Sequence, residues 1–307
     1  NWGRLSDMGI KLFQGDVRCA SDFESLMDVD WVIDAAANPS VLAGLDPGST
    51  RQLMEHNLVG TINVLEFCKR CHAGLLLLST SRVYSTTALR SLDLEVENEA
   101  FVPKRDQKWP IGVSSGGLSE SCSTAAPLSL YGASKLASEA LALEYAHAFG
   151  FPVWVNRCGL MAGAGQFGKS DQGIISYWVH AWAKGQPLRY IGFDGKGHQV
   201  RDVLHPRDLA ALISGQMEDP HRSADRICNV AGGQENAISL AQLSTWCADR
   251  FGPKQVGSEP EERPYDAPWL GMDSSKAINL WNWRPQISLT SILEEIAASV
   301  PACHDTT

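Results

Sequence analysis

The sequence lacks the features by which membrane proteins and nucleic-acid-binding proteins are usually recognised. No apolar run reaches the roughly 20 residues that a membrane-spanning helix needs. Positive charge is scarce, because 26 Lys and Arg face 35 Asp and Glu, which gives a formal net charge of −9. This acidity argues against nucleic acid or an anionic membrane as a partner. We therefore expect a cytoplasmic protein whose partner is a small molecule.

Cysteines are few and scattered, which argues against a disulfide framework. Of the eight cysteines, only Cys68 and Cys71 form a C-x-x-C pair, and no second pair accompanies it. His56 and His147 fall in predicted helices without metal-ligand spacing. The sequence therefore predicts reduced thiols in a cytosolic protein and no metal site.

The sequence does contain ample apolar material, 44% of its residues, arranged as alternating strands and helices. Hydrophobic patterns predict strands at 11–13, 31–37, 75–78 and 153–156, and helices at 21–27, 50–71 and 131–149. The second half predicts strands at 188–191 and 199–204, and helices at 206–217, 239–251, 274–280 and 289–299. Such alternation is typical of a doubly wound parallel α/β sheet. The long polar stretch 90–127 has no clear period, and we interpret it as an excursion over a site.

Two short segments carry candidate chemistry. Tyr131 and Lys135 lie four residues apart at a predicted helix start, so they share one face. A nearby ammonium lowers the pKa of a phenol, which can then exchange a proton with a hydroxyl. Thr80 follows a central strand, at the edge where parallel sheets bind ligands. Alone, each feature is more typical of a surface pair or a strand-end cap, so the rest of the sequence must decide.

The combination resembles a known family. Ser79-Thr80-Ser81-Arg82-Val83-Tyr84, followed by Tyr131-Gly132-Ala133-Ser134-Lys135, is similar to motifs of the extended short-chain dehydrogenase/reductases, which include nucleotide-sugar epimerases and dehydratases. Further similar segments follow in the family's order at residues 15–18, 35–37, 57–66, 200–205, 229–233 and 263–266.

The resemblance implies a fold, a cofactor and a set of site residues. The fold would be a Rossmann-like cofactor lobe, 1–156 with about 203–230, and a smaller α/β substrate lobe, 157–202 with 231–307. The cofactor would be NAD, and the catalytic residues Thr80, Tyr131 and Lys135. Cofactor contacts would be Asp16, Val17, Ala35, Ala36, Ala37, Asn57, Tyr131 and Lys135. Substrate contacts would be Ser81, Arg82, Asn156, Gln166, Lys169, Gln172, Arg201 and Arg263. The family's usual dimer surface would lie on helices 50–71 and 131–149, so a homo-oligomer is expected.

Details within the family narrow the expected reaction. Ser81 and Arg82 stand where 4,6-dehydratases carry an Asp-Glu pair, which removes the acid and base of that reaction. Residues 156–159, 165–173 and 197–205 are similar to CDP-paratose 2-epimerases, apart from Gly165, where relatives often carry arginine. The resemblance implies inversion at C2 of CDP-paratose, giving CDP-tyvelose, by transient oxidation and hydride return. Another nucleotide-sugar epimerase, a decarboxylase and a non-catalytic scaffold remain alternatives.

One expected motif is missing from the sequence. A dinucleotide-binding fold needs a glycine-rich turn after its first strand, where pyrophosphate meets a helix N-terminus. The glycines at 159, 163 and 165 lie past the middle of the chain, and those at 192, 195 and 197 fall between predicted strands. Relative to the family, the chain would begin after a βαβ unit of about 30 residues or more. We therefore expect this chain, either a fragment or a natural product without tight cofactor binding, to be poorly soluble or inactive alone.

Overall fold

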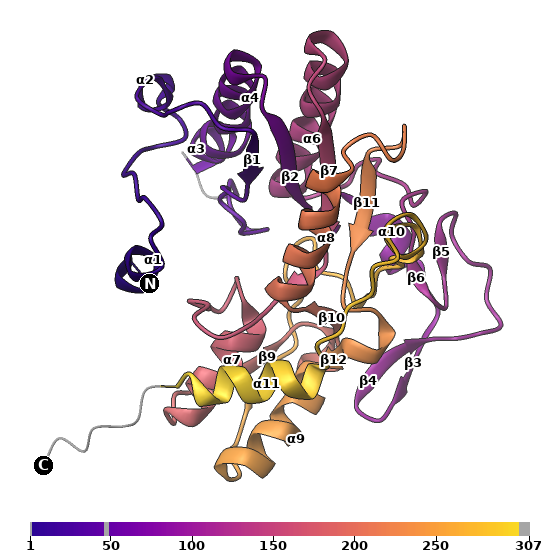
Figure 1. Ribbon diagram of the computed structural model, residues 1–307. Helices are drawn as coiled ribbons and strands as arrows, with labels where there is room; N and C mark the ends of the chain where they lie inside the picture. The colour runs from indigo at the N-terminus through magenta and orange to yellow at the C-terminus, as the bar shows by residue number, and fades with distance from the viewer. Residues whose placement is uncertain (1, 46–48, 301–307) are drawn as a thin grey trace, which may run out of the picture.

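A parallel four-stranded sheet forms the centre of the computed structural model, which describes residues 2–45 and 49–300 (Figure 1). The strands lie in the order β1 (Trp31–Asp34), β2 (Gly74–Thr80), β7 (Val153–Cys158) and β11 (Ile227–Val230). Leu75, Leu76 and Leu77 are fully buried, as expected for a central strand covered on both faces. The doubly wound α/β architecture predicted from the sequence is therefore confirmed.

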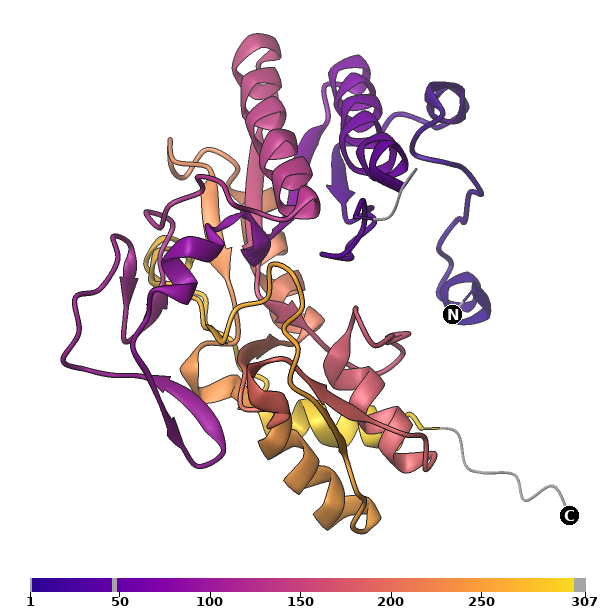
Figure 2. The same ribbon diagram turned by 180° about the vertical axis from the view of Figure 1, so that it is seen from behind.

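Helices cover both faces of this sheet (Figures 1 and 2). One face carries α4 (Gly60–Cys71) and α6 (Leu130–Phe149), which pack on Leu75 and Leu77. The other face carries α8 (Pro206–Glu218) and α10 (Ser275–Trp281), which pack around Leu76 and Trp154. Because successive strand residues point to opposite faces, these two clusters follow directly from the run of apolar residues in β2 and β7.

A second, smaller α/β layer accompanies the central sheet, and the predicted lobe boundaries stay a prediction. Its sheet has the order β12 (Ala237–Ser239), β10 (Val200–Leu204) and β14 (Trp269–Leu270), with β8 (Leu160–Met161) beside the end of β10. A separate ladder joins β9 (Arg189–Ile191) and β13 (Gly257–Glu259). Three helices pack together around Trp178 and Ile292, namely α7 (Ile174–Ala183), α9 (Leu240–Phe251) and α11 (Leu289–Ala298). Helix α7 is not among the helices predicted from the sequence.

The segment 90–127 does not lie over a site, so that prediction is wrong. It contains the end of α5 (Thr86–Arg90) and two hairpins, β3 (Leu94–Glu97) with β4 (Ala100–Pro103), and β5 (Val113–Ser114) with β6 (Gly117–Leu118). Val113 and Leu118 pack against Trp269 and Met272. The scattered apolar residues of this polar stretch thus build a cluster of their own.

The N-terminal region also departs from the prediction. It forms α1 (Trp2–Asp7) and α2 (Ala20–Glu24), but residues 11–13 are not a strand. A strand gains its backbone hydrogen bonds from a neighbour, and no described strand lies beside this segment. Within the described ranges β1 pairs with β2 alone, and Ile33 on β1 is 50% exposed. The remaining predicted helices and strands are present, with ends shifted by a few residues.

The predicted helix 50–71 is built from three consecutive pieces. These are α3 (Ser49–Met54), the π-turn η1 (Glu55–Val59) and α4. Short 3₁₀ turns occur elsewhere at η2 (Ser81–Val83), η3 (Phe193–Gly195) and η4 (Gln234–Asn236). None of the helices in the described ranges has the length and apolar character to cross a membrane. In the same ranges, no three His, Cys, Asp or Glu side chains gather as metal ligands would.

Candidate active site

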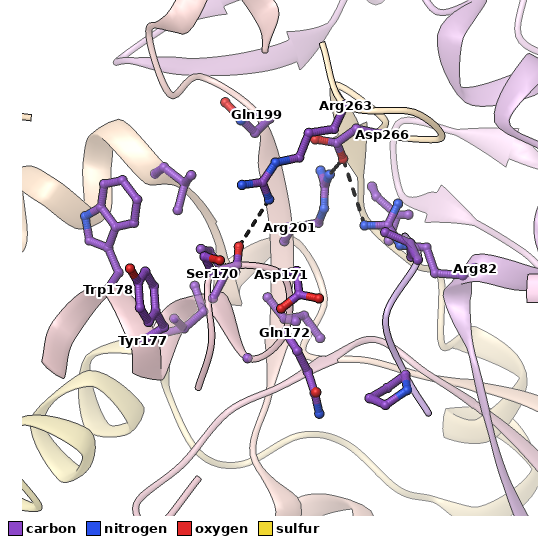
Figure 3. Close-up of a pocket in the computed structure, with 18 of the residues that line it drawn as sticks. Arg82, Ser170, Asp171, Gln172, Tyr177, Trp178, Gln199, Arg201, Arg263 and Asp266 are labelled. Atoms are coloured by element: carbon purple, nitrogen blue, oxygen red, sulfur yellow. Dashed lines mark hydrogen bonds and ion pairs between the residues drawn. The ribbon is translucent and has the colours of Figure 1, made fainter. Parts of the chain in front are cut away.

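A cavity of about 600 Å³ lies at the carboxyl ends of β2 and β7, where Thr80 and Cys158 line it. This is the edge at which open α/β sheets bind ligands. Figure 3 shows side chains of its wall. The cavity wall contains eight of the residues predicted from the sequence, namely Thr80, Ser81, Arg82, Tyr131, Gln166, Gln172, Arg201 and Arg263.

The end of β2 and the start of α6 place the first reactive pair. The Thr80 hydroxyl accepts a hydrogen bond from the backbone N–H of Arg82 at 3.2 Å, which ends the strand and starts η2. Ser129 caps α6 by accepting from the N–H of Gly132 at 3.0 Å, so Tyr131 lies in the first turn. Thr80 and Tyr131 line the same cavity, and the Thr80 hydroxyl acts to lower the pKa of Tyr131. The structure therefore brings the two predicted hydroxyl groups to one cavity wall.

Gly132 lets these two elements approach each other. A Cβ atom at this position would lie 2.2 Å from the Arg82 carbonyl oxygen, far inside van der Waals contact. Only a residue without Cβ allows this approach. The helix start and the strand end are consequently packed backbone against backbone.

Burial dominates the environment of the Tyr131 phenol. It raises the pKa of Tyr131, while the Thr80 hydroxyl and the positive charge of Arg82 act in the opposite direction. The expectation that Lys135 lowers the pKa of Tyr131 stays a prediction.

Lys135 lies one turn after Tyr131 and is 2% exposed. Its ammonium makes no hydrogen bond or ion pair with the other described residues. Burial lowers the pKa of Lys135, and the Asp34 carboxylate at the end of β1 acts against that change. A buried ammonium needs acceptors, and the ribose hydroxyls of a nicotinamide nucleotide would supply them. The residues present thus fit the nicotinamide-ribose half of NAD, whereas the sequence offers no glycine-rich turn for its pyrophosphate.

A buried ion pair lies beneath this pair of reactive hydroxyls. Glu139, two turns after Tyr131 on α6, accepts hydrogen bonds from Arg157 through both oxygens, the shortest at 2.7 Å from Nη2. The Ser79 hydroxyl also donates to Glu139. Arg157 completes its bonding by donating to the Tyr84 hydroxyl at 3.3 Å. Because Ser79 and Arg157 are direct partners in the β2–β7 ladder, the network joins α6 to both strands.

Three arginines project into the cavity from different segments (Figure 3). Arg201 of β10 donates to Asp266 at 2.6 Å, and Arg82 lies 3.9 Å from the same carboxylate. Arg263 instead donates to the Ser170 carbonyl at 3.1 Å. Arg189, Asp171 and Glu259 also line the cavity, so four guanidinium groups face three carboxylates. The small positive surplus and the forked donors suit an anionic diphosphate.

The far end of the cavity contains residues that the sequence interpretation missed. Tyr177, Trp178 and Gln199 line it (Figure 3). Trp178 is 1% exposed and donates to Ser244 at 3.0 Å, so it also packs between α7 and α9. Gln199 donates to the Ile191 carbonyl at 3.0 Å, and its own side-chain oxygen is buried with no partner among the described residues. Gln199 lies two residues before Arg201 in the sequence, and this spacing could have identified it as a residue of the site.

Two predicted substrate contacts are not part of the cavity wall, and their role stays a prediction. Asn156 is fully buried and exchanges two hydrogen bonds with Gln216 of α8, at 2.8 and 2.9 Å, so it joins the sheet to a helix. Lys169 is exposed, and its backbone forms hydrogen bonds with Gln172. Gln166 lines the cavity, and its amide donates to the Met161 carbonyl of β8 and accepts from the Ser176 hydroxyl of α7.

The predicted cofactor contacts at Asp16, Val17, Asn57 and residues 35–37 are not part of the cavity wall. Asp16 forms an ion pair with Arg18, which holds the pKa of its carboxyl well below the ordinary range. The Val17 carbonyl accepts from Asn63 at 2.8 Å. Asn57 bonds the Asn38 backbone and the Ser134 hydroxyl, which ties the loop after β1 to α6. Ala35, Ala36 and Ala37 form the start of that loop. Their role as cofactor contacts stays a prediction.

Comparisons with known proteins agree with this geometry. CDP-paratose 2-epimerase of Salmonella typhi is 26% identical over 292 residues, covering 92% of this chain and 82% of that protein. UDP-glucuronate 4-epimerase of Thermodesulfobacterium geofontis is 26% identical over 286 residues, covering 91% and 76%. The structure of UDP-glucuronic acid 4-epimerase from Bacillus cereus, in complex with UDP-glucuronic acid and NAD, superposes with a TM-score of 0.74 at 21% identity, covering 97% of this chain and 85% of that one.

A family model also matches most of the sequence. The model described as "NAD dependent epimerase/dehydratase family" matches residues 1–231, which include the Thr80–Tyr131 pair, Lys135 and Arg201. The fold, the cavity and this match lead to one conclusion: the chain belongs to the NAD dependent epimerase/dehydratase family.

Proposed function

We propose that this protein epimerises a nucleotide sugar, with NAD as its cofactor. The observation that carries the proposal is the content of one cavity, which is lined by the Thr80 and Tyr131 hydroxyl groups together with Arg201 and Arg263. The hydroxyl pair suits proton exchange with a sugar, and the two guanidinium groups suit its diphosphate. Neither feature alone would select a nucleotide sugar.

The side chains suggest a division of roles. Bound NAD would supply hydride chemistry, accepting a hydride from the sugar carbon and returning it. Tyr131 removes the proton of the reacting hydroxyl and later returns it to the same oxygen, while Thr80 orients that oxygen by a hydrogen bond. Lys135 holds the nicotinamide ribose. Arg201 and Arg263 bind the diphosphate, which leaves the sugar free to turn so that the opposite face of the carbon is presented.

For the substrate we propose CDP-paratose, inverted at C2 to CDP-tyvelose. Support comes from the segments 165–173 and 197–205, which resemble those of CDP-paratose 2-epimerases, and from the relative of that name. A relative named for a UDP-sugar is equally identical at 26%. We therefore propose a UDP-sugar epimerase as the second candidate. We also propose that the protein acts in the cytoplasm as a homo-oligomer.

A substrate panel tests the function. The protein is expressed from its full open reading frame, purified and supplied with NAD. It is then incubated separately with CDP-paratose, UDP-glucuronic acid and UDP-glucose, and the products are followed by NMR in deuterated water. We expect CDP-tyvelose to form, with no solvent deuterium at the inverted carbon. Turnover of a UDP-sugar alone would replace the substrate assignment, and release of carbon dioxide would replace epimerisation by decarboxylation. No turnover of any of these would favour a non-catalytic scaffold.

Replacing Arg201 by Ala is expected to raise KM by about 10- to 100-fold, because a charge-assisted hydrogen bond contributes about 1.5–3 kcal/mol. The change in kcat should be much smaller, since diphosphate binding persists through the transition state. Steady-state kinetics with the nucleotide sugar that is turned over measure both. Arg250→Ala, at a surface ion pair with Glu294, is the control. An unchanged KM in Arg201→Ala would remove this residue from the binding site.

A further inference from the structure

We propose that Ser40 and Asp171 are positioning residues that form a clasp across the cavity and control the entry and exit of a nucleotide. The clasp is the hydrogen bond that the Ser40 hydroxyl donates to the Asp171 carboxylate at 2.8 Å. The inference rests on the proposed function only in taking a nucleotide as the ligand of the cavity.

The clasp joins two loops that are far apart in the sequence. Ser40 belongs to the loop 35–45, which follows β1, and Asp171 belongs to the loop 162–173, between β8 and α7. Both loops contribute several side chains to the cavity wall. The hydrogen bond itself is exposed, so the clasp lies on the solvent side of that wall.

The loop 35–45 is fixed to the helix that carries Tyr131. The Asn57 side chain is 1% exposed, and it accepts from the Asn38 N–H at 2.7 Å and donates to the Asn38 carbonyl at 3.2 Å. The same amide donates to the Ser134 hydroxyl of α6 at 3.0 Å. One half of the clasp is therefore anchored to the wall that holds the reactive phenol.

The two partners of the clasp are oriented by their own neighbours. The Ser40 hydroxyl accepts from the Leu42 N–H at 3.3 Å, so its proton remains for the Asp171 carboxylate. On the other loop, Lys169 and Gln172 exchange backbone hydrogen bonds at 2.7 and 3.2 Å. These bonds shape that part of the loop into a tight turn around Asp171.

This turn is the part of the wall that can move. Residues 169–172 are exposed, whereas wall residues on helices, such as Tyr131 and Trp178, are buried. Segments with few buried contacts open at low cost, and loops of this kind commonly open to admit ligands. Arg263 also holds the turn, by donating to the Ser170 carbonyl at 3.1 Å (Figure 3). A diphosphate that engages Arg263 would compete for this bond, and the clasp would then hold the turn.

The clasp should act on the rates of binding. Both of its partners belong to the protein, so the bond gives a nucleotide no direct attraction. It stabilises the closed arrangement of the two loops, which a nucleotide must open to enter and again to leave. Breaking the clasp should therefore raise the association and dissociation rate constants together, while the Kd changes little. Loss of a residue that contacts the nucleotide would instead raise mainly the dissociation rate constant.

Stopped-flow tryptophan fluorescence with CDP and with UDP tests this, using protein expressed from its full open reading frame. In Ser40→Ala and in Asp171→Ala both rate constants should rise about 3- to 10-fold, the equivalent of one hydrogen bond. The double variant should show no further rise. Ser40→Thr keeps the hydroxyl and should behave like the wild type. So should Ser91→Ala, which removes a surface hydroxyl bonded to the Ala88 carbonyl. Unchanged rate constants, or a rise in dissociation alone, would overturn the proposal.

Hydrogen exchange followed by mass spectrometry needs no nucleotide. Ser40→Ala changes one loop, and we expect it to speed amide exchange about 3- to 10-fold in the other, at residues 169–173, whereas Ser91→Ala should not. Equal exchange in the wild type and Ser40→Ala would overturn the inference even if nucleotide sugars are epimerised. If no nucleotide sugar is converted and neither CDP nor UDP binds, but exchange moves as expected, the proposed function fails and the clasp between the loops stands.

Discussion

Tyr131→Phe should lower kcat by about 10²- to 10⁴-fold, the range that a well-placed general acid–base group contributes. Phe keeps the ring in its buried place in the first turn of α6 and removes only the oxygen that exchanges the proton. Binding should change little, because no diphosphate contact is lost. Rapid-quench or NMR kinetics with the accepted nucleotide sugar would separate kcat from KM.

Tyr145→Phe is the matched control for this loss. Tyr145 lies on the same helix, outside the cavity, where its hydroxyl donates to Glu66 at 2.7 Å. Its kcat should equal that of the wild type. If Tyr131→Phe retained full turnover, Tyr131 would no longer be the proton acceptor, and the functional proposal would lose the residue on which it most depends.

Glu139→Leu should lower the free energy of unfolding by about 3–5 kcal/mol. The substitution leaves the Arg157 guanidinium buried, 5% exposed, without its carboxylate. A buried unpaired charge costs far more than the net gain of an intact pair, and the Ser79 hydroxyl also loses its acceptor. Urea unfolding followed by tryptophan fluorescence would measure the change.

The double variant Glu139→Leu with Arg157→Met should recover much of this loss, because an apolar pair carries no desolvation cost. Glu55→Gln is the surface control. Its ion pair with Arg51, whose side chain is 90% exposed, should contribute only about 0.3–0.5 kcal/mol. If Glu139→Leu proved as mild as Glu55→Gln, the network under the reactive hydroxyls would contribute little to the fold.

The sequence predicted the parts of the fold that depend on local pattern. The unbroken apolar run at 75–78 identified the central strand, and the spacing of Tyr131 and Lys135 placed both on one helix. The prediction of a strand at residues 11–13 was wrong because a strand needs a neighbouring strand to pair with, and no local pattern reveals that neighbour. The interpretation of the segment 90–127 as an excursion over a site was wrong because its few apolar residues pack against residues 267–272, which lie far along the chain.

The sequence predicted those residues of the site that belong to recognisable motifs. Thr80, Arg82 and Arg201 were found in this way. The position of Asn156 outside the cavity could not be predicted, because its partner, Gln216, lies 60 residues further on, and the amide pair exists only once α8 packs on the sheet. Helical spacing predicted that Tyr131 and Lys135 share a face, but it could not predict how strongly burial acts on the phenol.

The close approach at Gly132 sets limits on any attempt to change the sugar preference by mutagenesis. Because even one methyl group there would collide with a carbonyl oxygen, libraries that randomise position 132 would consist largely of misassembled proteins. Side chains that reach the cavity from other segments, such as Tyr177 and Gln199, carry no such backbone constraint. Diversity placed at those positions would sample new substrates while the reactive pair remains assembled.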